Sequence, residues 1–209
     1  MSLTYNQIAG RSVERIATLS DGLFAIAMTL IVFEIRVPDP TPINTEAQLW
    51  AAISDLAPRL VTYFLSFLTL GIFWHGQQSQ LAYLDRSDRH YSWLQLSFLA
   101  FVAMLPFTTS LLAEFIQFRL AIVIYWLNIL LFGLTLTLAW TYARRAGLVR
   151  AGTPEAVHLA IRRRTIIGQA LYAIGVLLCV IDTRLSIAFI VAVQLNFALG
   201  LRLPILGRV

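Results

Sequence analysis

The sequence lacks lysine, has one cysteine and carries few charges of either sign. Only 13% of its 209 residues are charged, and all sixteen basic residues are arginines. Ordinary soluble domains carry about a quarter charged residues. Cys179 has no second cysteine with which to form an intrachain disulfide. So low a charge content disfavours a soluble globular protein.

Catalytic and cofactor-binding motifs are also lacking. The three histidines, His75, His90 and His158, are scattered and form no HExxH pattern, and the sequence contains neither a P-loop nor a GxGxxG motif. Cys179 lies inside an apolar run with no obvious base beside it. We therefore expect no enzymatic activity, no bound cofactor and no metal site.

Apolar residues dominate what is present. They make up 58% of the chain, and the mean hydropathy is +0.74. A soluble protein of this size cannot bury so much apolar surface, because a small sphere keeps much of its surface wet. The basic pI of about 9.9 could suggest nucleic acid. However, the arginines fall in short connections between apolar runs, which is typical of membrane orientation. The chain is thus predicted to be a membrane protein that contacts lipid and binds no nucleic acid.

Six apolar segments are long enough, or nearly so, to cross a bilayer as helices, for which about 20 residues are needed. Proline-containing or charged connections separate them. We predict an all-α fold in which residues 1–209 form one six-helix transmembrane domain. The approximate spans are 12–36, 50–74, 91–114, 120–143, 160–181 and 185–204.

The arginines are distributed unevenly between alternate connections. If the N-terminus lies inside, the inner segments contain Arg11, Arg15, Arg86, Arg89, Arg144, Arg145, Arg150, Arg162, Arg163, Arg164, Arg202 and Arg208. The outer segments contain Arg36, Arg59, Arg119 and Arg184. Cytoplasmic loops are enriched in basic residues, so both termini are predicted to be cytoplasmic.

The first span carries a regular apolar seam. Leu19, Leu23, Ile26, Leu30 and Phe33 are spaced by four, three, four and three residues, which is the spacing of a coiled-coil contact face. The seam could pack against identical copies around a symmetry axis. Alternatively, the seam could pack against other helices of the same chain. Periodicity alone favours this second interpretation.

Two charged residues near the start of this span require partners or water. Arg15 and Asp21 are six residues apart and therefore do not form an i, i+4 pair. The end of the second span and the start of the third lie on the same predicted side. Their polar groups there are Trp74, His75, Gln77, Gln78, Trp93 and Gln95. We expect a hydrogen-bond network among these residues. The alternative is that Arg15 and Asp21 are solvated in the headgroup region.

The segment from Arg15 to Gly22, Arg-Ile-Ala-Thr-Leu-Ser-Asp-Gly, resembles the Arg-x-x-x-Phe-Ser-Asp motif of the transmembrane protein 175 family. These proteins are endosomal and lysosomal potassium channels and their bacterial relatives. The residues from Trp74 to Gln78 and the segment 105–109 are similar to second- and third-helix patterns of the family. Leu19 departs from the motif by replacing its Phe.

The resemblance implies a homotetramer of six-helix subunits whose first helices line a central pore. It places the constriction at Ile26, further apolar rings at Leu30 and Phe33, and a hydroxyl ring that influences ion selectivity at Thr29. The implied network around the motif consists of Arg15, Ser20, Asp21, Trp74, Gln77 and Gln78. A potassium-permeable channel of weak to moderate selectivity is expected, with K⁺ and other monovalent cations as permeant ions. The single repeat suggests a multi-pass protein of a prokaryotic plasma membrane.

A proton-conducting channel or a cation/proton secondary transporter is the alternative function. Acidic residues inside a membrane are candidate functional sites. The candidates here are Asp21, Glu34 and Glu114, and none lies near the middle of an uncharged span. A proton relay usually requires a chain of such groups, so we rank this alternative below the cation channel. Relatives often carry a His pair where this chain has Gln77 and Gln78, and Gln does not titrate near neutral pH, so we expect the pH response of the network to differ here.

Overall fold

The computed structural model describes residues 12–41 and 43–199, and the regular structure of this part is helical. The helices are α2 (Val13–Leu30), the 3₁₀ turn η1 (Ile31–Glu34), α3 (Glu46–Ser54), α4 (Ala57–Leu81), α5 (Arg89–Glu114), α6 (Arg119–Arg145), α7 (Glu155–Leu177), the 3₁₀ turn η2 (Leu178–Val180) and α8 (Thr183–Leu199). The predicted all-α class is confirmed. A helix satisfies its backbone hydrogen bonds internally, as the bilayer interior requires.

Five helical segments of the described part are long and apolar enough to cross a bilayer. They are Val13–Glu34, Ala57–Leu81, Arg89–Glu114, Arg119–Arg145 and Glu155–Val180. The sixth apolar helix, α8, has 17 residues. Residues 200–204 of the expected last span lie outside the described residues, as do Arg11, Arg202 and Arg208. Six spans therefore stay a prediction.

The second span differs from the expected range of 50–74. Trp50 belongs to α3, a separate short helix with no buried residue, which begins with a capping box at Thr45. The chain then turns, and α4 starts at Ala57 with Pro58 in its first turn. Proline fits the first turn of a helix, where its missing N–H costs nothing. At its other end α4 runs on to Leu81, because the polar residues that follow its apolar run still face the protein interior.

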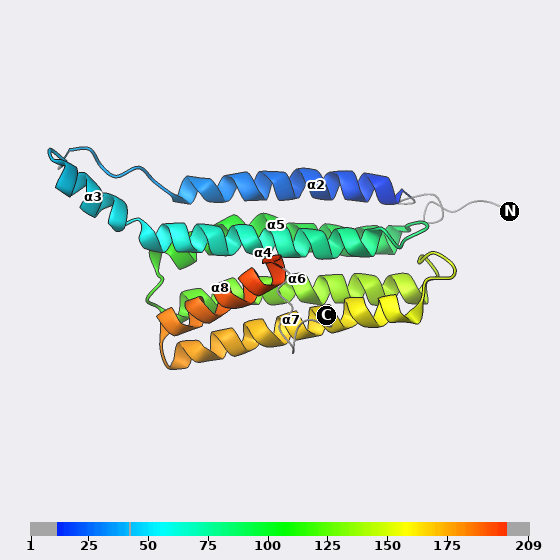
Figure 1. The fold of residues 1–209 in the computed structure, drawn as a ribbon. Helices are drawn as coiled ribbons and strands as arrows, with labels where there is room; N and C mark the ends of the chain where they lie inside the picture. Colours follow the sequence, from blue (N-terminus) through cyan, green and yellow to red (C-terminus); the bar gives the residue numbers. More distant parts are fainter. Residues whose placement is uncertain (1–11, 42, 200–209) are drawn as a thin grey trace.

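The helices pack side by side as an elongated bundle (Figure 1). α2 lies along one side, beside α4 and α5, while α6, α7 and α8 form the other side (Figure 1). Aromatic side chains fill the interface between these helices: the rings of Phe73 and Phe132 lie 4.9 Å apart, and those of Phe24 and Phe98 lie 5.9 Å apart. The core thus extends continuously from α2 to α8.

The connections α4–α5 and α6–α7 meet at one end of the bundle, hereafter the arginine-rich end (residues 82–88 and 146–154). Asp85 donates its backbone N–H to the carbonyl of Leu148 at 2.9 Å, and Arg150 donates to the carbonyl of Tyr83 at 2.9 Å. The N-terminal end of α2 lies at the same end (Figure 1). Nine of the twelve arginines assigned to the inner side fall in the described residues and belong to this end or to the adjoining turns.

A glycine lets α7 and α8 approach closely near the opposite end. A Cβ atom added at Gly175 would lie 2.7 Å from Cγ1 of Ile190. At this crossing Ser186 donates its hydroxyl to the carbonyl of Gly175 at 2.7 Å. Small residues permit such close contacts between membrane helices, so Gly175 fixes how α8 packs against α7.

Candidate functional site

α2 has one buried face and one exposed apolar face. Its buried residues are Ser20, Phe24 and Ala27, and Ile31 of η1 continues the same line. Their spacing of four, three and four residues follows one face of a helix. This face packs against α4 and α5, so it attaches the first helix to the rest of the chain.

A second face of α2 is apolar and uncovered. The exposed fractions are 49% for Leu19, 58% for Ile26, 45% for Leu30 and 73% for Phe33. Of the seam predicted from sequence, Leu23 alone packs partly against the core. The interpretation that the whole seam packs within the same chain is therefore wrong. Four apolar residues remain available to contact something outside the chain.

The end of this face is not regular α-helix. α2 ends at Leu30, and η1 continues the chain as a 3₁₀ turn through Glu34, where an unbroken helix to residue 36 was expected. Such tighter turns are frequent at helix ends. Pro38 follows, and a proline cannot continue the preceding hydrogen-bond ladder. Phe33 therefore sits in a different helical register from Ile26.

Thr29 lies on the exposed side of α2 between Ile26 and Leu30. Its hydroxyl donates to the helix's own carbonyls, with Oγ1 lying 3.1 Å from the oxygen of Ala25 and 2.8 Å from that of Ile26. This is a common arrangement of a mid-helix threonine. The lone pairs of Oγ1 stay free to accept from, or to coordinate, a group outside the helix.

Asp21 is anchored to α4 by two hydrogen bonds. Oδ1 accepts the indole N–H of Trp74 at 2.7 Å and the side-chain N–H of Gln78 at 2.8 Å. Bonds to an ionised acceptor are the stronger kind. The interpretation in which Asp21 is simply solvated is therefore wrong, although its side chain also stays exposed.

A second, fully buried chain of hydrogen bonds runs beside this anchor. Gln77 donates to Oγ of Ser20 at 2.9 Å and to Oε1 of Gln95 at 2.7 Å. Gln95 in turn donates to the hydroxyl of Tyr91 at 2.6 Å. All four residues are at most 1% exposed. The chain ties α2, α4 and α5 together at the arginine-rich end.

The expected network is only partly realised. The structure brings Ser20, Asp21, Trp74, Gln77 and Gln78 together, but the side chain of Arg15 is exposed and makes no ion pair with the described residues. Likewise, within residues 12–41 and 43–199, the side chains of His75 and Trp93 donate no hydrogen bond to the network. Tyr91 was missed, and its spacing of four residues from Gln95 on one helix face was the available signal.

A third polar cluster, also missed, lies in the middle of the bundle. The hydroxyl of Tyr125 lies 3.1 Å from both Ser66 and Thr69, and Thr109 donates to Ser66 at 2.7 Å. Gln194 of α8 donates to Thr69 at 2.6 Å. Each of these residues sits singly in an apolar run, so sequence periodicity gave no reason to group them. The cluster links α4, α5, α6 and α8.

The acidic residues at the end of the bundle opposite the arginine-rich end make contacts with residues at that same end. Glu114 forms an ion pair with Arg59 at 2.6 Å, and Arg59 also donates to the backbone carbonyl of Glu34 at 3.3 Å. Asp39 accepts from the backbone N–H and hydroxyl of Thr41, and these bonds hold the pKa of its carboxyl below the usual value. These acids lie away from the anchor at Asp21 and do not form a continuous chain with it.

Comparison with known proteins agrees with the sequence motif. The family model described as "Endosomal/lysosomal potassium channel TMEM175" matches residues 15–106. A protein of Streptomyces collinus named as a potassium channel is 32% identical over 181 residues, covering 83% of this chain and 85% of that protein. The human endosomal/lysosomal proton channel TMEM175 is 37% identical over 100 residues, which are 46% of this chain and 20% of the human protein.

A solved structure also resembles the whole fold. It is the crystal structure of a lysosomal potassium-selective channel TMEM175 homologue from Chamaesiphon minutus, at 28% identity and a TM-score of 0.76. The match covers 90% of this chain and 97% of the other. Since sequence and fold agree over most of both chains, this protein belongs to the TMEM175 family.

Proposed function

We propose that the protein is the subunit of a potassium-permeable cation channel of weak to moderate selectivity, with α2 lining the pore. The observation that carries this proposal is the uncovered apolar face of α2, which is distinct from the face that attaches it to α4 and α5. Bacterial relatives named as potassium channels support the proposed ion. Membership in a channel family supports transport rather than enzymatic catalysis.

A homotetramer with a central axis is the proposed assembly. One helix cannot enclose a pore, and Leu19, Ile26, Leu30 and Phe33 would be covered if identical copies of α2 faced one another. We further propose six spans, with both termini cytoplasmic and the protein in a prokaryotic plasma membrane. The arginine distribution supports this orientation.

Conduction is proposed to depend on apolar rings. Ile26 would form the narrowest ring and Leu30 and Phe33 further rings, which can close a pore by dewetting it. Thr29 lies one turn from Ile26, and its hydroxyl oxygens would offer ligands to a partly dehydrated cation. Asp21, held by Trp74 and Gln78, would keep the start of α2 in a fixed position relative to α4.

The proposal is tested by ion flux from liposomes that contain the purified protein. Potassium efflux without a counter-ion, and slower sodium efflux under the same gradient, is the expected result. Empty liposomes provide the control. Absence of flux for both cations, in protein that is folded by circular dichroism, would contradict the proposal.

Proton conduction is a second candidate, because vertebrate relatives are named as proton channels. A pH-sensitive dye inside the same liposomes distinguishes proton conduction from potassium conduction. Proton uptake under a pH gradient, in the absence of other permeant cations, would favour this candidate. A cation/proton exchanger would instead couple the two fluxes, so that cation flux stops when proton flux is prevented.

A further inference from the structure

Two adjoining cavities lie between α4, α6 and α7, away from the exposed face of α2. The first has a volume of about 250 Å³ and the second about 610 Å³. Gln80, Ile161 and Thr165 line both cavities, so together they form one groove. α8 fills the space between α4 and α7 only toward the opposite end, and its described part stops at Leu199 (Figure 1).

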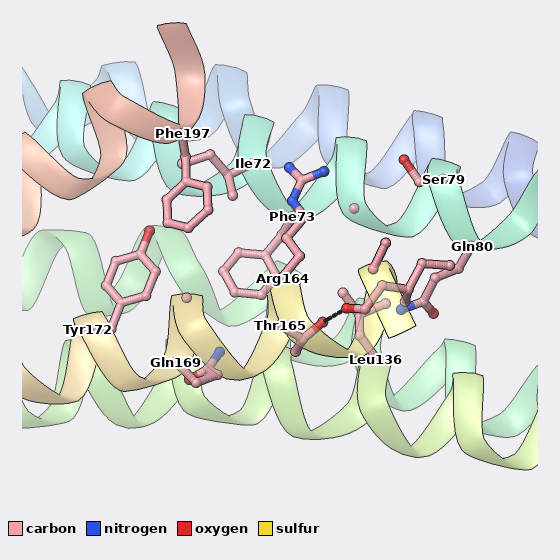
Figure 2. Close-up of a pocket in the computed structure, with 14 residues that line it drawn as sticks. Ile72, Phe73, Ser79, Gln80, Leu136, Arg164, Thr165, Gln169, Tyr172 and Phe197 are labelled. Carbon is pink, nitrogen blue, oxygen red and sulfur yellow. Dashed lines mark hydrogen bonds between the residues drawn. The ribbon is translucent and has the colours of Figure 1, made fainter. Parts of the chain in front are cut away.

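The first cavity is mostly apolar, with one charged residue in its wall. Ile72, Phe73, Leu136 and Phe197 contribute apolar side chains. Figure 2 shows Arg164 pointing from α7 across this cavity toward α4. Such a lining fits a hydrocarbon chain beside a polar group better than it fits water alone.

The second cavity lies at the arginine-rich end and is basic. Arg144, Arg145 and Arg162 line it, together with His158 and Trp140. Arg144 forms an ion pair with Glu155 at 3.1 Å. Arg145, Arg162 and Arg164 make no ion pair or side-chain hydrogen bond with the described residues. The groove therefore carries an excess of positive charge.

Buried polar atoms of the same groove also lack partners. Trp140 is 4% and His158 is 8% exposed, and neither Nε1 of Trp140 nor Nδ1 of His158 has a hydrogen-bond partner among the described residues. Oε1 of Gln80, at the junction of the two cavities, is likewise unpaired in this part of the chain. An unsatisfied buried polar group costs about 1–3 kcal/mol. A ligand with several acceptor oxygens would satisfy the donors among these groups.

We propose that this groove binds an anionic phospholipid of the inner leaflet. The phosphate lies in the basic cavity among Arg145, Arg162 and the indole N–H of Trp140, and one acyl chain occupies the apolar cavity beside Phe73. Basic pockets between transmembrane helices on the cytoplasmic side are known to hold anionic headgroups. Residues 200–209 contain Arg202 and Arg208 and no Asp or Glu, so charge favours an external anion over this segment as the occupant.

The test is native mass spectrometry of the full-length protein in detergent, titrated with dioleoyl phosphatidylglycerol or dioleoyl phosphatidylcholine. The expected result is tighter retention of phosphatidylglycerol. The double variant Arg145→Gln/Arg162→Gln should lose about 30-fold in that affinity, since each arginine near an anionic headgroup contributes about 1 kcal/mol. Arg163→Gln is the matched control, because Arg163 is exposed on the same helix and lines neither cavity. Equal binding by the double variant and the control would overturn the proposal.

The apolar cavity is tested separately with Gly76→Phe. Gly76 lines this cavity, and a Cβ added there would meet nothing within 4 Å, so the ring can fill the space reserved for the acyl chain. Weaker phosphatidylglycerol binding at an unchanged unfolding temperature is expected. If Gly76→Phe has no effect and inorganic phosphate displaces the lipid, the groove is a site for free phosphate and the lipid proposal is wrong. Equal affinity for the two lipids in the native protein would also refute it.

Discussion

The indole of Trp74 on α4 donates a 2.7 Å hydrogen bond to the carboxylate of Asp21 on α2. This contact joins positions 53 residues apart and lies beside the buried chain that starts at Ser20. Two successive residues of α2 thus bond to α4 by different routes, one exposed and one buried. The first helix is held there by directional bonds as well as by apolar packing.

Asp21→Ala should lower the unfolding temperature. The change removes the acceptor of both Trp74 and Gln78, and each lost bond contributes about 1 kcal/mol at a partly exposed site. Thermal unfolding followed by light scattering or tryptophan fluorescence measures the shift. Glu14→Ala is the control, because Glu14 is an exposed acid on the same helix. An equal unfolding temperature for the two variants would contradict the anchoring role.

Gly175→Ala should destabilise the packing of α7 against α8. The new methyl would lie 2.7 Å from Cγ1 of Ile190 and 3.1 Å from Cδ1 of Phe189, and overpacking costs typically 1–3 kcal/mol. Gly168→Ala on the same helix is the control, because its Cβ would meet only Phe197, at 3.9 Å. The control should be neutral or more stable, since Ala favours the helix. A reversed order of unfolding temperatures would show that α8 adapts easily.

Ile26→Gly should increase potassium leak from liposomes if Ile26 forms the constriction. Removing the side chain widens and wets an apolar ring. Ala25→Gly carries a loss of helix propensity that is at least as large, about 1 kcal/mol, without removing a large apolar group. An unchanged flux in Ile26→Gly relative to Ala25→Gly would place the constriction elsewhere.

Thr29→Val should reduce the discrimination of potassium from sodium. The two side chains have similar shapes, but valine offers no oxygen to a cation. Reversal potentials in mixed-cation recordings provide the measurement. Thr18→Val is the control, since the hydroxyl of Thr18 also donates to a carbonyl of its own helix, at 2.9 Å, but lies about three turns nearer the arginine-rich end. Unchanged reversal potentials would remove Thr29 from the selectivity mechanism.

Apolar periodicity predicted the membrane helices well because the bilayer imposes one requirement along a whole span. It failed at the start of the second span, since the short helix α3 and the transmembrane helix α4 both contain apolar residues, and only the turn before Pro58 separates them. It also gave the wrong partner for the seam of α2. Periodicity identifies a contact face but not which surface covers it.

The polar contacts could be predicted in part. Asp21 interrupts an apolar run, so its need for a partner was visible, and topology brought the end of the second span near it. The bonds among Ser66, Thr69 and Tyr125 were not predictable from spacing, because isolated hydroxyl residues are common in membrane helices and their pairing depends on helix rotation. The groove between α4 and α7 was likewise not predictable, because it depends on how α4, α6 and α7 pack together.

The bond from Gln194 to Thr69 joins residues 125 positions apart. A ribosome releases α4 into the membrane well before α8 emerges, so during synthesis Thr69 first exists without this partner. The polar side chain of Gln194 enters the bilayer interior only where earlier helices already offer a site for it. Correct maturation of the protein in the cell is thereby tied to the synthesis of α8, which completes a core that the preceding membrane helices have prepared.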